Sequence, residues 1–125
     1  MAFTLQDELI AIRSALELDG VPVIIRATMT PGDELPASGT HIVIDLVPSA
    51  PGNDFGGSVY EDIDVQLQVW SDVSLVSALA SAEAARGRMA TLNYAKSSGT
   101  RFDRDEDFVG VVMSFMSVAM FDALA

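Results

Sequence analysis

The segment 58–70, SVYEDIDVQLQVW, alternates apolar and polar residues over its whole length. Successive side chains of a β-strand point to opposite faces, so this period of two predicts one long strand. One face is aliphatic apart from an acid near its start, and it holds Val59, Glu61, Ile63, Val65, Leu67 and Val69. The other face holds Tyr60, Asp62, Asp64, Gln66, Gln68 and Trp70. The aliphatic face of the strand therefore packs on a core. The other face mixes acidic, amide and aromatic side chains and is not uniformly charged.

Two segments have helical spacing instead. The apolar residues of the first lie three or four positions apart, and they are Leu5, Leu9, Ile12 and Leu16. Gly20 and Pro22 then end this helix, because neither residue continues one well. The second helix covers 73–92, is rich in alanine, and has Leu75, Leu79, Ala82, Arg86 and Met89 at helical spacing.

Three further segments, 21–27, 40–49 and 108–121, have strand patterns. The Gly-rich loop 50–57 joins the second of these strands to 58–70, which predicts an antiparallel hairpin. Segments 93–99 and 100–108 are interpreted as a polar turn and a charged stretch. The resulting fold is α+β, with about four mostly antiparallel strands and two helices packed on the sheet, in the order α-β-β-β-α-β, as a single domain over 1–125.

The last strand, 108–121, is apolar on both faces and must be covered on both. In a chain of 125 residues with only two helices, one subunit would struggle to provide both covers. Half of the residues are hydrophobic, yet the net charge is −11. Apolar surface in excess of one small core is typical of a subunit interface, and the negative charge keeps the remaining surface soluble.

Charge and composition exclude several classes of function. Only seven lysines and arginines are present, so tight binding of nucleic acid is not expected. The lack of cysteine removes disulfides, thiolate nucleophiles and zinc–thiolate sites. The longest apolar segment, 109–121, is interrupted by Gly110, Ser114 and Ser117 and is too short to cross a membrane. The acidic start of the chain is unlike a signal peptide and predicts a mature intracellular N-terminus.

The sequence contains no recognisable combination of catalytic residues. His41 is the single histidine, stands at the start of a predicted strand, and is interpreted as structural. Asp62 and Asp64, with Glu61, are interpreted as solvated strand residues. Nothing resembles a nucleophile elbow or a phosphate-binding loop. We therefore expect no enzyme, no catalytic residue and no cofactor.

One acidic cluster remains, in the segment 101–107, RFDRDED. Its acids are Asp103, Asp105, Glu106 and Asp107. Alternate carboxylates can bind a hard cation, but the segment lacks the glycine and the distal glutamate of a calcium loop and contains two arginines. The preferred interpretation is a solvated charged hairpin or one side of a salt-bridged subunit contact, and no metal ligand is predicted.

The segment 65–92, VQLQVWSDVSLVSALASAEAARGRMATL, is a strand that ends in Trp-Ser-Asp and enters an Ala-rich helix. Together with the N-terminal helix, the two long β-runs and the final strand, it resembles the tail terminator (tail completion) proteins of long-tailed bacteriophages and gene transfer particles. The resemblance covers nearly the whole chain. It implies a homo-oligomeric ring, usually a hexamer, that caps the tail tube and joins it to the head connector.

The resemblance also implies partners and contact residues. The partners are further copies of the chain, the tail tube protein and the head-tail connector protein, at the head-proximal end of the virion tail after assembly in the host cytoplasm. The expected interface residues are Tyr60, Gln66, Gln68, Trp70, Met113, Phe115 and Met116. Asp62 and Asp64 are expected to face the channel, where their charge would let DNA pass without sticking. The alternatives are a head-tail adaptor or tail assembly chaperone without a closed ring, and a cryptic enzyme or metal protein using 103–107.

Overall fold

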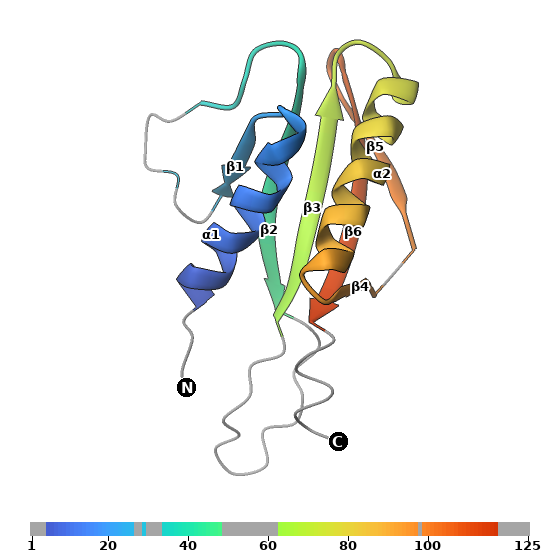
Figure 1. Cartoon of the computed structure of the whole chain (residues 1–125). Helices are drawn as coiled ribbons and strands as arrows, with labels where there is room; N and C mark the ends of the chain where they lie inside the picture. Colours follow the sequence, from blue (N-terminus) through green and yellow to red (C-terminus); the bar gives the residue numbers. More distant parts are fainter. Residues whose placement is uncertain (1–4, 27–28, 30–33, 49–62, 98, 118–125) are drawn as a thin grey trace.

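A computed structural model describes residues 5–26, 29, 34–48, 63–97 and 99–117. The elements are α1 (Leu5–Leu16), the 3-10 turn η1 (Glu17–Asp19), β1 (Val23–Ile25), β2 (Thr40–Pro48), β3 (Ile63–Ser71), α2 (Leu75–Thr91), β4 (Tyr94–Lys96), β5 (Arg101–Asp105) and β6 (Phe108–Ser117). Both helices lie on the same face of one sheet, with α1 beside β1 and α2 over β3 and β6 (Figure 1). The opposite face carries neither helix.

The sheet is mixed. Its strand order is β1-β2-β3-β6, and both β4 and β5 pair with the remaining side of β6. The predicted hairpin is confirmed, because β2 and β3 pair antiparallel along their whole length. Only the pairing of β1 with β2 is parallel among the described strands. The α+β class is thus confirmed, with six strands rather than about four.

The two strands that the sequence analysis missed are β4 and β5, in segments interpreted as a polar turn and a charged stretch. Both are short and lie on the edge of the sheet, and β5 is mostly exposed. β5 carries no alternation of apolar and polar residues because neither of its faces is buried, and β4 is only three residues long. These strands form because β6 offers them a free row of backbone hydrogen-bonding groups, a feature of the sheet rather than of the local sequence.

The core lies between the helices and the sheet. It is built from alternate residues of the long strands and from one stripe of each helix. The strand residues include Ile42, Ile44, Val65, Leu67, Val69, Val111, Met113 and Phe115. In α1 the predicted apolar stripe is confirmed at Leu9, Ile12 and Leu16.

The stripe of α2 that faces the core agrees with the predicted one at Ala82 and Met89 and differs from it elsewhere. Its buried residues are Ala78, Ala82, Ala85 and Met89, whereas Leu75, Leu79 and Arg86 are exposed. Alanines let the helix approach the sheet closely, so the small residues pack inward and the leucines remain outside. Ser74 provides the N-cap, because its side chain accepts a hydrogen bond from the backbone N–H of Ser77.

The end of α2 is tied to η1 by an ion pair between Arg88 and Asp19. Arg88 Nη2 lies 3.0 Å from Asp19 Oδ1, and Arg88 Nε lies 3.3 Å from Asp19 Oδ2. This hydrogen bonding lowers the pKa of the Asp19 carboxyl. We expect Arg88→Gln to return that pKa toward its ordinary value of 3.8, measured by an NMR titration of side-chain carboxyls.

The matched control for this prediction is Arg86→Gln, which removes the same charge from the same helix. Arg86→Gln should leave the lowered pKa of the Asp19 carboxyl unchanged, because the contact with Arg88 and not the net charge of the helix lowers this pKa. An Asp19 carboxyl that titrates identically in wild type and Arg88→Gln would contradict the assignment.

Candidate functional site

The sheet face opposite the helices, here called the open face, collects the polar residues of the long alternating strand. Cross-strand partners lie on the same face of a sheet, so the register decides which side chains meet there. Gln66 pairs with Asp45 on one side and Ser114 on the other, and Gln68 pairs with Val43 and Val112. The open face thus combines β2, β3 and β6.

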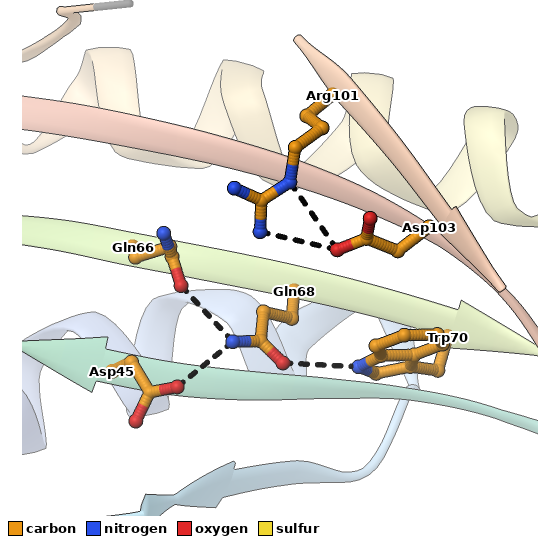
Figure 2. A network of polar contacts seen from close by, with 6 residues as sticks. All are labelled: Asp45, Gln66, Gln68, Trp70, Arg101 and Asp103. Carbon is orange, nitrogen blue, oxygen red and sulfur yellow. Dashed lines mark hydrogen bonds and ion pairs between the residues drawn. The ribbon is translucent and has the colours of Figure 1, made fainter. Parts of the chain in front are cut away.

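Four side chains of the open face, Asp45, Gln66, Gln68 and Trp70, form a connected network that we call the glutamine ladder (Figure 2). Gln68 Nε2 donates to Asp45 Oδ2 at 2.8 Å and to Gln66 Oε1 at 3.0 Å. Trp70 Nε1 donates to Gln68 Oε1 at 3.2 Å. The central glutamine therefore uses both ends of its amide, which holds its neighbours in one arrangement.

The one ionised group of the ladder is neutralised from the neighbouring strand. Arg26, directly after β1, places its Nε 3.0 Å from Asp45 Oδ1. The ladder and this arginine together carry no net charge, although the whole chain carries −11. The open face thus includes a polar, neutral patch on a strongly acidic protein.

One end of the open face carries an aromatic corner, formed by His41, Trp70 and Phe108. His41 and Trp70 are cross-strand partners. The His41 and Phe108 rings meet edge to face with their centroids 5.6 Å apart. Trp70 lies over Gly110, where an added Cβ would stand 2.7 Å from the indole ring. Glycine is required here because only the bare backbone leaves room for the indole.

The structure separates the predicted interface residues into two groups. Gln66, Gln68, Trp70 and Met116 are partly exposed, and the register places them on the open face. Met113 and Phe115 lie on the opposite face of β6, in the core beneath the helices, with exposed fractions of 4% and 1%. Because Met113 and Phe115 are enclosed within one subunit, we leave them out of the candidate interface.

Two of the predicted residues lie outside the part of the chain that the structure describes, and a third is described by its backbone alone. Tyr60 and Asp62 precede the described start of β3. Asp64 lies within β3, where its backbone pairs with Val47, but its side chain is outside the described set. The expectation that Asp62 and Asp64 face a channel therefore stays a prediction.

The acidic cluster 103–107 covers the end of β5 and the turn into β6, so the interpretation as a charged hairpin is confirmed, although no strand was predicted there. Asp103 is paired with Arg101, with Arg101 Nη2 and Asp103 Oδ2 3.1 Å apart (Figure 2). Across the described ranges, no three histidine, aspartate or glutamate side chains come together as a metal site. Among the same residues, no helix is both long and apolar enough to span a membrane.

Sequence reasoning missed the contributions of Asp45, Arg26 and Gly110. An acid in the middle of an apolar strand was the available signal at Asp45. Its partners follow from the strand register and from the parallel docking of β1, which no local pattern reveals. No protein-family model matches this chain, and no curated protein matches it at a significant level.

Proposed function

We propose that this protein is a structural subunit that assembles with copies of itself through the open face of its sheet. The observation that carries the proposal is the glutamine ladder, a preorganised polar network on the face that neither helix covers. A rigid surface of this kind binds a partner with little loss of side-chain freedom. Trp70 adds a large, amphipathic side chain of the type enriched at interfaces.

Charge supports the choice of this face. Copies of a chain with a net charge of −11 repel one another wherever acidic surfaces meet. The ladder avoids this repulsion, since Arg26 balances Asp45 and the other members are uncharged. Met116, partly exposed on the same face, supplies an adaptable apolar contact.

The more specific proposal is a tail terminator that forms a ring, usually a hexamer, between the tail tube and the head connector. The resemblance of segment 65–92 supports it, together with a fold in which neither helix covers the face that carries the partly exposed Gln66, Gln68, Trp70 and Met116. In this role the partners are the tail tube protein and the head-tail connector protein, and DNA passes through the ring. The function needs no catalytic residue or cofactor.

The test is a pair of substitutions that add the same charge to different faces. Met116→Asp places a carboxylate on the open face, and Val76→Asp places one on the outer side of α2, where Val76 is 75% exposed. We expect native mass spectrometry and electron microscopy to show ring-sized particles for wild type and Val76→Asp. Met116→Asp should be a folded monomer by circular dichroism, because burying an unpaired charge opposes association.

Three results would contradict the proposal. A wild-type monomer or dimer, also in the presence of the tail tube and connector proteins, would favour the adaptor or chaperone without a closed ring. Loss of the ring in Val76→Asp alone would move the interface to the exposed apolar residues at the start of α2, Leu75 and Val76, and to Val73 just before it. Rings that survive Met116→Asp unchanged would exclude the open face.

A further inference from the structure

His41, in the aromatic corner, is a buried polar side chain without a hydrogen-bond partner. The residue is 3% exposed, and neither Nδ1 nor Nε2 bonds to any residue in the described part of the chain. Buried polar groups are nearly always paired, because leaving one unpaired forfeits the hydrogen bonds that water would make. The imidazole is tolerated here as a neutral ring, packed edge to face on Phe108.

The surroundings of His41 offer one charge that favours protonation. Asp72, just after β3, raises the pKa of His41, but burial lowers it by more. The other open-face charges are already engaged or lie at the rim. Asp45 is paired with Arg26 and Asp103 with Arg101, while Asp105 is exposed opposite Phe108. Trp70, Phe108 and Gly110 bring no charge from β3 and β6.

Asp72 makes no hydrogen bond to His41 in the present arrangement, and its carboxylate already binds the backbone before β2. Its Oδ1 accepts a hydrogen bond from the backbone N–H of Gly39 at 2.9 Å, directly before β2. A positively charged ring therefore either remains buried without a partner or leaves the aromatic corner to reach the Asp72 carboxylate. Both routes weaken the junction of β2 and β3 at this end of the sheet.

We propose that His41 is an acid-sensitive latch, whose protonation expels the ring from the aromatic corner and loosens Trp70. The proposal goes beyond assembly, because it concerns the packing of a single subunit. The corner is stable while the ring is neutral. On protonation Trp70 loses its cross-strand neighbour and becomes mobile over Gly110.

The sign of the pH dependence follows from the lowered pKa of His41. At pH values between the folded pKa and the ordinary value of 6.5, the unfolded chain binds more protons than the folded one. The contribution of His41 to stability is therefore complete above pH 6.5 and is lost as the pH falls from there through the folded pKa. Asp19, whose carboxyl pKa is also lowered in the folded state, acts in the same direction, since its contribution to stability is likewise lost as the pH falls through its folded pKa.

The chain contains one histidine and one tryptophan, so the latch has two unambiguous reporters. We expect the His41 NMR signal of the wild type to titrate with a midpoint below 6.5. The fluorescence of Trp70 should change with the same midpoint. In His41→Phe and His41→Leu, which keep the corner apolar, the fluorescence change in this pH range should be absent.

Two outcomes would overturn the latch. One is a His41 midpoint at or above 6.5. The other is a Trp70 fluorescence change of equal size and midpoint in the variants. If neither variant folds by circular dichroism, the wild type alone decides: coincident NMR and fluorescence midpoints support the latch, and midpoints more than about one pH unit apart, a clear difference by the spread of histidine values, exclude it.

Discussion

Phe115→Ala is expected to lower the free energy of unfolding by about 3–5 kcal/mol, the usual range for truncating a buried aromatic ring. Phe115 is 1% exposed and belongs to the core beneath the helices. It also pairs with Val65 of β3 and Lys96 of β4, so the lost ring leaves a cavity where β6 joins both neighbouring strands. Urea unfolding followed by circular dichroism measures the change.

The matched control is Met116→Ala, one residue further along β6 and on the opposite face. Met116 is partly exposed, so its truncation should change the free energy of unfolding by less than about 1 kcal/mol under conditions where the protein is monomeric. Equal losses for the two variants would contradict the assignment of the two faces of β6. The pair also separates folding from assembly, because only Met116 belongs to the candidate interface.

Gly110→Val is expected to destabilise the protein by about 1–3 kcal/mol, the typical penalty for adding atoms to a filled site. An added Cβ would lie 2.7 Å from two carbons of the Trp70 indole. Moving the indole aside also disturbs its hydrogen bond to Gln68 Oε1. Strand propensity alone predicts the opposite sign, because valine is favoured over glycine in a strand.

The control for this substitution is Gly87→Ala, at a glycine in the C-terminal part of α2 with open space around it. Replacing a helical glycine by alanine should stabilise the protein by about 0.5–1 kcal/mol. Thermal unfolding should therefore shift in opposite directions for the two variants. A Gly110→Val protein that is as stable as wild type would show that Trp70 does not rest on this glycine.

Preorganisation connects the fold to the proposed role. The two helices cover one face of the sheet and bury its aliphatic residues, which leaves the polar face of β3 for another use (Figure 1). There the side chains bind one another through Gln68 and present a fixed surface (Figure 2). An assembly subunit needs such a surface more than it needs a cleft. The Met116→Asp and Val76→Asp pair tests whether the chain uses it in this way.

The candidate site was predictable only in part. The alternation in 58–70 placed Gln66, Gln68 and Trp70 on one face, away from the aliphatic core, as the described part of β3 confirms. The same reasoning could not assign the faces of β6, because 108–121 is apolar on both sides and carries no alternation. Met113 and Phe115 were therefore grouped with Met116, although they occupy the opposite side of the strand.

The amino-acid sequence by itself determined the elements whose signal is periodic: both helices, the long strands and the antiparallel pairing of β2 with β3. Periodicity is local, so it needs no knowledge of the neighbours. Only the tertiary structure decided that β4 and β5 add to the edge of β6, that alanines rather than leucines of α2 face the core, and that Gly110 receives Trp70. These features depend on strand register and on close approach between segments that are distant in the chain. The free energy of each such contact depends on both segments, so neither segment alone reveals it.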